Sequence, residues 1–226
     1  MVAGDGLELR WVRPPQQARS QETLHRILDA AEELVAEKGF EDAPISEIVR
    51  RASSSVGAFY ARFEDKNGLL RALSSRFVEQ AMATADAALD PARWEGATIP
   101  QILRAVVGFL VSIYRERAGL IRAFVIRNQT DLEFRARQDR ISLYVKSRVC
   151  DLLLARAAEI HHPDPDRAVR FGINLVFNTL EDVVLFGELR PSALALSDGE
   201  FAAELTRAYL AYLGVADARE GREERA

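Results

Sequence analysis

A run of three serines followed by an aromatic stretch is the part of this chain whose residue types could do chemistry. Ser53, Ser54 and Ser55 stand directly before the segment VGAFY, residues 56–60. The start of a helix exposes backbone amides, and a serine hydroxyl there can either cap those amides or hydrogen-bond a phosphate oxygen. Small hydroxyl side chains ahead of bulky rings suit the insertion of a short helix into a groove of double-stranded DNA.

The residues after the serines divide between reading bases and contacting the DNA backbone. Val56 and Ala58 are apolar, so at a base edge they could read only a thymine methyl group or shape. Gly57 costs ~1 kcal/mol in a helix relative to alanine, which suggests a position where a side chain would collide with the sugar-phosphate backbone. Tyr60 can rest its ring on the core and reach a phosphate with its hydroxyl.

Two aromatic rings and a lysine complete this segment. Phe59 and Phe63 are four residues apart, so they share a helix face and are expected to anchor it in the core. Lys66 opens the next helix and would add positive charge beside its exposed amides. The alternative for Lys66 is an ordinary solvated side chain.

Short helices separated by tight breaks must position these residues. Apolar periodicity predicts a first helix over 21–38. A second helix is expected with Pro44 at its first position and Asp42 as the nearest side chain able to cap it. The third is expected from the serine run to near Phe63, and Asp65 can cap a fourth. This is the pattern of a helix-turn-helix with a supporting helix.

Charge and composition restrict the classes of function. The net charge of −4 argues against a wholly electrostatic nucleic-acid binder, yet residues 50–76 hold six Lys or Arg against two Asp or Glu, a net +4. The single cysteine, Cys150, cannot form an internal disulfide and is expected to be buried. No apolar run approaches the ~18 residues of a membrane span, and no secretion signal is recognisable, so a cytoplasmic protein with no membrane partner is expected.

The segment resembles the TetR/AcrR transcriptional regulators, whose pattern reads approximately A-G-V-S-x-G-x-x-Y-x-x-F-x-x-K-x-x-L-L. The matching residues are Ala52, Ser55, Gly57, Tyr60, Phe63, Lys66, Leu69 and Leu70. The stretch ILDAAEELVAEKGF at 27–40 is similar to the first helix of the family, and the close resemblance covers about residues 20–72. Departures are Ser53 and Ser54 in place of a common glycine and apolar residue, Ala43 in place of a threonine cap, and Val56 in place of a frequent basic residue.

The resemblance implies an all-α protein with an N-terminal three-helix helix-turn-helix DNA-binding domain and a larger C-terminal helical domain for dimerisation and ligand binding. It further implies a homodimeric, sequence-specific transcriptional regulator, usually a repressor that a small-molecule effector releases from its operator, with activation left open. The predicted DNA contacts are Ser54, Ser55, Val56, Gly57, Ala58, Tyr60 and Lys66. The alternative is a helical interaction protein that has lost DNA binding, which Val56 and the net-acidic first 80 residues favour.

Proline and glycine at 90–100 mark the expected domain boundary, and long helices are expected beyond it, near 100–117, 118–128, 131–160, 165–188 and 198–214. The predicted division is a flexible arm (1–19), the DNA-binding domain (20–66), a connecting helix (67–89), the effector-binding and dimerisation domain (90–215) and a disordered tail (216–226).

The stretch from Val169 to Phe186 is apolar almost all round, so a second copy of the chain is the simplest cover for it. The expected dimer residues are Val183, Phe186, Leu205, Tyr209 and Tyr212. Three polar residues line up within this helix, namely Asn174, Asn178 and Glu181. They could fix the register of the dimer, orient an effector or lie exposed to solvent.

The walls of an effector cavity are expected among aromatic, aliphatic and amide side chains of the middle helices. The candidates are Phe109, Ile113, Tyr114, Phe124, Tyr144, Asn174, Phe177 and Asn178. Arginines are dense between 115 and 148, and one that points inward would favour an anionic ligand. The effector itself is left unidentified.

An enzyme is the main rival class, and the residues disfavour it. His161 and His162 lie in a proline-flanked loop without Cys or carboxylates at ligand spacing on one helix face. No nucleophile elbow, phosphate loop or Glu-x-x-His motif occurs. No catalytic residue, cofactor or metal is therefore expected.

Overall fold

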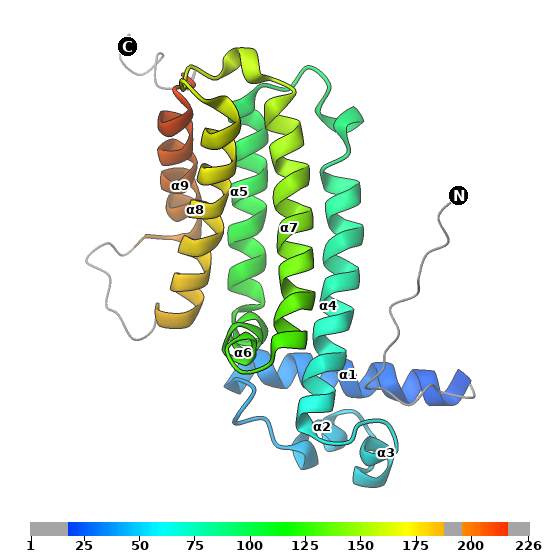
Figure 1. The fold of residues 1–226 in the computed structure, drawn as a ribbon. Helices are drawn as coiled ribbons and strands as arrows, with labels where there is room; N and C mark the ends of the chain where they lie inside the picture. Colours follow the sequence, from blue (N-terminus) through cyan, green and yellow to red (C-terminus); the bar gives the residue numbers. More distant parts are fainter. Residues whose placement is uncertain (1–17, 188–195, 217–226) are drawn as a thin grey trace. The chain divides into compact units, whose positions relative to one another are not determined.

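The computed structural model describes residues 18–187 and 196–216, and every regular element within them is helical. The expected all-α class is confirmed. In chain order the elements are α1 (Ala18–Lys38), α2 (Ile45–Arg51), α3 (Val56–Tyr60), α4 (Lys66–Ala88), the 3₁₀ turn η1 (Pro91–Trp94), α5 (Ile99–Glu116), α6 (Ala118–Asn128), α7 (Leu132–Leu154), the 3₁₀ turn η2 (Ala157–Glu159), α8 (Pro165–Phe186) and α9 (Asp198–Leu213) (Figure 1). Almost all of the predicted arm (1–19) and tail (216–226) lie outside the described residues.

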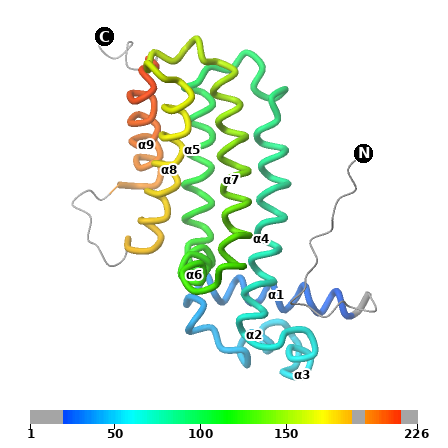
Figure 2. Tube along the Cα trace, viewed as in Figure 1, coloured from blue at the N-terminus to red at the C-terminus, as the bar shows by residue number. Residues whose placement is uncertain are grey.

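The chain divides into two compact units, and each unit combines two separate stretches of the sequence. The course of the chain can be followed by its colours in Figure 2. Among the described residues, the first unit holds 18–81 together with Arg117–Asp139, and the second holds Met82–Glu116 together with 140–187 and 196–216. The division passes through α4 and through α7, whereas a single boundary at 90–100 is expected from the sequence. The reason for the difference is that α6 and the start of α7 bury their apolar residues in the first unit.

The core of the first unit is built on the apolar face of α1, which packs against α2 and α6. Ile27, Leu34 and Val35 are fully buried on that face. Gly119 at the start of α6 permits the approach of the two helices, because a Cβ atom there would overlap the carbonyl oxygen of Val35. Residue 119 must therefore lack a side chain for α6 to lie on α1.

The second unit is a helical bundle in which α5 packs against both α8 and α9, and α8 packs against α9 (Figure 1). The buried side of α5 carries Leu103 and Val107, which share one core with Ile173 of α8 and Leu213 of α9. Cys150 of α7 joins this core as a buried thiol, as expected. The apolar residues at helical spacing on α5, α7, α8 and α9 thus form the hydrophobic core of the second unit.

Side-chain caps are present at the start of some helices and absent at the start of α2. Asp65 accepts a hydrogen bond from the Gly68 amide at the start of α4, and Ser197 forms a reciprocal capping box with Glu200 at the start of α9. Asp42 does not cap α2, and Pro44 is the extended residue before that helix instead of its first residue. The expected Asp42 cap and first-position Pro44 are therefore wrong.

The helix expected over 131–160 ends at Leu154, and an arginine side chain beyond its end satisfies one of its last carbonyl groups. The Arg156 guanidinium donates to the carbonyl oxygen of Leu152 at 2.8 Å and to that of Ala97 at 2.5 Å. The second bond reaches a segment 59 residues earlier in the chain, so periodicity alone could not place this helix end.

Candidate nucleic-acid interface

The turn between α2 and α3 depends on one strained residue. Ser53 has a φ of +48°, and it is the one non-glycine residue with positive φ in the described part of the chain. Left-handed backbone is costly for residues with a Cβ atom, and this explains why glycine is common at this position of the sequence pattern. The turn is held by bonds from the amides of Ser53 and Ser54 to carbonyl oxygens of α2.

The serines at the start of α3 have different roles. Ser55 is the N-cap, because its Oγ accepts a hydrogen bond from the Ala58 amide at 3.1 Å. The Oγ of Ser54 is buried and has no hydrogen-bond partner within residues 18–187 and 196–216. Capping is thus confirmed for Ser55, and a contact with DNA by either serine stays a prediction.

The aromatic residues of this segment separate into core and surface. Phe59 and Phe63 are fully buried with ring centroids 5.0 Å apart, as expected of core anchors. Tyr60 places the edge of its ring on Phe59 and is 50% exposed. Val56 is 47% exposed, and Gly57 beside it is exposed too. α3 therefore presents Val56, Gly57 and Tyr60 outward from a fixed base.

Three of the six cations counted over 50–76 form ion pairs with carboxylates from other segments of the chain. The Arg51 guanidinium binds both carboxylate oxygens of Glu37, at 2.5 and 2.8 Å. Arg76 contacts Asp29 and Glu32 on α1. The linear count of +4 therefore overstates the positive potential of the candidate interface.

Two further cations of this segment have structural partners. Arg62 donates to the carbonyl oxygen of Ala58 and to both oxygens of Ser20, which ties the end of α3 to the start of α1. Lys66 donates to the carbonyl oxygen of Glu41 at 2.9 Å and lies 4.6 Å from the centre of the Phe40 ring. Burial lowers the pKa of Lys66. Lys66 is thus no ordinary solvated lysine.

Asp131 provides a pH-dependent contact within the first unit. Its carboxylate accepts hydrogen bonds from Arg71 at 2.8 Å and from the Phe134 amide, and these bonds lower the pKa of Asp131 to about 2. Because the folded pKa lies below the unfolded value of ~3.9, the stabilisation is complete above pH ~4 and is lost as the pH falls toward 2.

Asp131→Asn is expected to lower the free energy of unfolding by ~1–2 kcal/mol at pH 7, since the Asp131 side chain is only 11% exposed. The difference from the wild type should shrink as the pH falls from 4 to 3, measured by urea unfolding. Glu79→Gln, at an exposed position of α4, is the control and should show no such trend. A difference that does not change with pH would show that the charge of Asp131 contributes nothing.

The residues expected to line an effector cavity are only partly brought together. Tyr114 and Phe177 meet with ring centroids 6.3 Å apart, and Lys146 lies 4.8 Å from the Phe177 ring centre and donates to Asn174. Burial raises the pKa of Tyr114. These residues pack on one another, so their position in a cavity wall stays a prediction.

Phe124 differs from the others, because it lies in the core of the first unit against Phe77 and Phe134. The expectation that it lines an effector cavity in the C-terminal domain is corrected on this ground. Phe109 is 46% exposed, and Asn178 is exposed as well. Tyr144 donates from its hydroxyl to Asp86, and Ile113 is half-buried.

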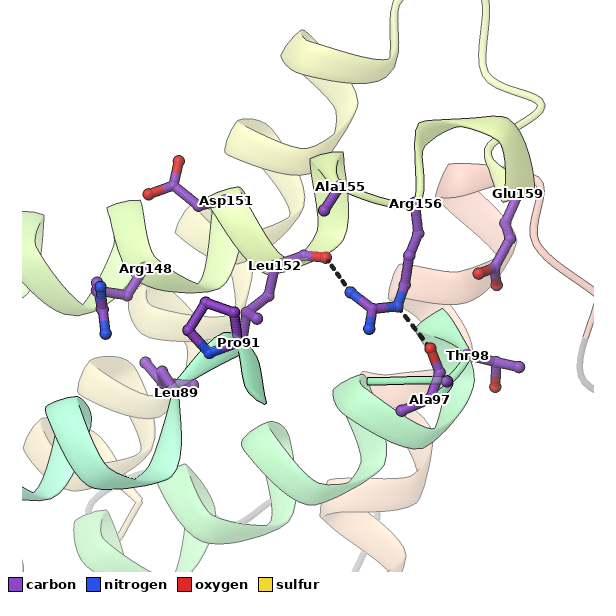
Figure 3. Close-up of a pocket in the computed structure, with 11 residues that line it drawn as sticks. Leu89, Pro91, Ala97, Thr98, Arg148, Asp151, Leu152, Ala155, Arg156 and Glu159 are labelled. Carbon is purple, nitrogen blue, oxygen red and sulfur yellow. Dashed lines mark hydrogen bonds between the residues drawn. The ribbon is translucent and has the colours of Figure 1, made fainter. Parts of the chain in front are cut away.

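A pocket of about 540 Å³ lies elsewhere in the second unit (Figure 3). It is lined by residues of three segments: Leu89, Pro91, Gly96, Ala97 and Thr98 after α4, Arg148, Asp151, Leu152, Ala155 and Arg156 along and after the end of α7, and Glu159 of η2. None of the expected wall residues lines it. Sequence reasoning missed it because its walls come from loops and the far end of α7.

The residues expected at a dimer contact differ in how exposed they are. Tyr209 is buried within its own chain and its hydroxyl donates to the Val169 carbonyl, so it belongs to the bundle core and the expectation is corrected. Phe186 is exposed, and Val183, Leu205 and Tyr212 are half-buried. Exposed Phe171 and Leu175, four residues apart on α8, were missed because the sequence shows α8 as apolar all round.

The three polar residues aligned on α8 lie mostly at the surface. Asn174 and Asn178 are exposed, and Glu181 is half-buried. Within the ranges that the structure describes, no group of three or more His, Cys, Asp or Glu side chains is arranged to hold a metal ion. No helix in those ranges has the length and apolar character needed to cross a membrane.

The N-terminal segment of this chain is similar in sequence to known regulatory proteins. Residues 27–73 match the family model described as "Bacterial regulatory proteins, tetR family". The HTH-type transcriptional regulator YvdT of Bacillus subtilis is 42% identical over 53 residues, which cover 24% of this chain and 27% of that protein. UidR of Escherichia coli K12 is 36% identical over 67 residues, which cover 30% of this chain and 34% of that protein. The matched region thus spans about a quarter to a third of these relatives.

Solved structures match over most of the chain at low identity. A bacterial regulatory protein in the tetR family from Rhodococcus RHA1 has a TM-score of 0.63 at 23% identity, covering 86% of this chain and 98% of that one. FadR of Bacillus subtilis, solved in complex with stearoyl-CoA, has a TM-score of 0.62 at 20% identity, covering 84% and 98%. These likenesses establish the shared fold beyond the matched N-terminal region.

Proposed function

We propose that this chain, whose residues 27–73 match the tetR family of bacterial regulatory proteins, is a sequence-specific DNA-binding transcriptional regulator. The observation that carries the proposal is the α3 surface. A capped helix rests on buried Phe59 and Phe63 and turns Val56, Gly57 and Tyr60 outward. A helix that is packed firmly on the core and exposes side chains on its other face is what reading of the major groove requires.

We assign the DNA contacts to α3 and its flanks, namely Ser54, Ser55, Val56, Gly57, Ala58, Tyr60 and Lys66. Of these, Ser55, Val56, Gly57 and Tyr60 are exposed, and Ser54, Ala58 and Lys66 are half-buried. Since most arginines nearby are paired within the protein, few phosphates should be neutralised by this surface. Shape, methyl contacts and hydroxyl contacts would then contribute a larger share of the affinity.

The proposed regulator is a homodimer that acts as a repressor in the cytoplasm and is released by an effector bound in the second unit. Two α3 helices must enter successive major grooves ~34–36 Å apart, and a ligand that favours another separation weakens the complex. Exposed Phe171, Leu175 and Phe186 on α8 are candidates for burial between copies. The dimer would thus fix the spacing that the operator requires.

An interaction protein without DNA binding is the less favoured alternative. A mobility-shift assay with genomic fragments, performed with the full chain at low ionic strength, separates the two. We expect a retarded complex on a subset of fragments, with competition by the same fragments. Failure to retard any fragment at low ionic strength would remove the proposed function.

Tyr60→Phe is expected to weaken binding to specific and nonspecific DNA by a similar factor, because it removes one hydroxyl contact with a phosphate. Lys66→Ala should do the same and also lower the log–log salt slope by ~0.9, the contribution of one phosphate contact. Thermal unfolding must accompany the Lys66 variant, since its ammonium also binds the Glu41 carbonyl.

Tyr144→Phe, in the second unit, is the matched control and should leave DNA affinity unchanged. A change of base preference with affinity retained, in either the Tyr60 or the Lys66 variant, would show that the residue reads bases and not phosphates.

A further inference from the structure

We infer that the pocket beside the end of α7 is the effector site, and that its ligand is a small organic monocarboxylate with an apolar body. This inference rests on the proposed function, since it gives that regulator its effector class. The pocket volume of about 540 Å³ lies within the ~300–1,000 Å³ typical of small-molecule sites. Leu89, Pro91, Leu152 and Ala155 supply an apolar wall.

Two arginines line the pocket, and their guanidinium groups differ in what they bind. Arg156 is occupied, because it donates to the carbonyl oxygens of Ala97 and Leu152 (Figure 3). It also donates to the carbonyl oxygen of Trp94. These bonds hold the 94–97 segment against the end of α7. Arg156 is therefore part of the wall and not the group that would capture a ligand.

Arg148, by contrast, forms no hydrogen bond that joins two segments of the described chain. Its Nε atom is buried without a hydrogen-bond partner in the described portion of the chain, and no ion pair to it occurs there. Figure 3 shows its side chain on the side of Leu89, near Pro91. Arg148 lines the pocket, so the rest of its guanidinium group is the cation on which a bound carboxylate would form charge-assisted hydrogen bonds.

Two carboxylates limit the charge of the ligand. Glu159 already accepts a hydrogen bond from the Ile99 amide at 3.1 Å, and Asp151 lies exposed at the pocket rim. Both would repel a second negative charge, so a dianionic phosphate fits less well than a single carboxylate. The apolar wall would cover the rest of such a molecule.

The pocket is also placed to influence the DNA-binding unit through continuous helices. Arg148 and Leu152 lie in the part of α7 that belongs to the second unit, while Leu132–Asp139 of the same helix belongs to the first. Leu89 directly follows α4, whose first part, from Lys66, belongs to the first unit. A ligand that contacts both helix ends can thus favour one arrangement of the helices over another.

The binding experiment uses the full chain without DNA and defined probes. Octanoate and 2-naphthoate are titrated calorimetrically beside their neutral amides. We expect at least one carboxylate to bind the wild type ~10-fold more tightly than its amide, and Arg148→Gln to remove that preference. Arg140→Gln, an exposed arginine of α7 that does not line the pocket, is the matched control and should bind as the wild type does.

A second variant tests the location of the binding site without changing any charge. Ala155→Phe should fill the pocket and abolish binding of acid and amide alike while the thermal unfolding midpoint stays near that of the wild type. Binding of no carboxylate, equal binding of acid and amide, or an Arg148→Gln protein that retains the preference would each overturn the assignment.

A mobility-shift titration then separates this inference from the proposed function. The carboxylate that binds should weaken the DNA complex of the wild type and leave that of Ala155→Phe unchanged. DNA binding that persists with no effect of any bound carboxylate would reject the effector role alone. Absence of DNA binding in the first place would reject the proposed function instead.

Discussion

Gly57→Leu is expected to weaken operator binding by two orders of magnitude or more, equivalent to about 2.7 kcal/mol, while the protein remains folded. The fold itself has room for a side chain at this position, because a Cβ atom would meet nothing closer than the Ser55 Oγ at 3.9 Å. Gly57 is exposed between Val56 and Ala58 on the face of α3 proposed to enter the groove. A leucine would therefore collide with DNA and not with the protein.

The matching alanine variant makes the test sharper, because stability and affinity should change in opposite directions. Gly57→Ala removes a flexible glycine from a helix and should stabilise the free protein by ~0.5–1 kcal/mol. Operator affinity should nevertheless fall, since the added methyl group occupies space that the DNA backbone needs. Thermal unfolding and mobility shift on the same preparation measure both.

Gly108→Ala is the control for the helix effect alone. Gly108 lies in α5, and a Cβ atom there meets nothing within 4 Å. Stabilisation without loss of DNA binding is expected. Full operator affinity in Gly57→Leu would show that α3 does not approach DNA at this residue, and the proposed reading face would have to be abandoned.

Gly172→Ala is expected to destabilise the second unit by ~3 kcal/mol, the upper end of the usual cost of overfilling a packed core. A Cβ atom on residue 172 of α8 would overlap three ring atoms of Tyr209 on α9. The ring cannot swing away easily, because Tyr209 is buried and its hydroxyl donates to the Val169 carbonyl. The two helices would have to separate to admit the methyl group.

A double-mutant cycle identifies the cause of that loss. Tyr209→Leu alone should destabilise the protein by removing the buried ring, but Gly172→Ala should then cost little in the Tyr209→Leu background. Chemical unfolding followed by circular dichroism gives the four free energies. Additive effects of the two substitutions would show that the ring is not the obstacle, and Gly108→Ala again serves as the control for helix propensity.

The contact between α8 and α9 has a consequence for the proposed dimer. Since Tyr209 fills the gap over Gly172 within one chain, a second copy must use other residues of these helices. Phe171 and Leu175 are the large exposed apolar side chains of α8 that remain for it, together with Phe186. Loss of dimer in a Phe171→Glu variant would accord with the proposed arrangement.

The sequence by itself determined the presence and approximate positions of the helices, the helix-turn-helix segment and its core anchors. Local rules decide these features: apolar spacing fixes which face of α1 is buried, and Phe59 and Phe63 four residues apart must share a side of the chain. Capping bonds at Ser55, Asp65 and Ser197 also join near neighbours in the sequence, although the same rule wrongly favours Asp42 as a cap of α2.

Only the tertiary structure decided which charges are free and which apolar residues meet. The carboxylates that neutralise Arg51, Arg71 and Arg76 lie 14 to 60 residues away along the chain, so a local count gives the wrong potential. Phe124 is assigned to the first unit for the same reason, since its partners come from α4 and α7. Burial and pairing are set by residues that are distant in sequence, and periodicity carries no information about them.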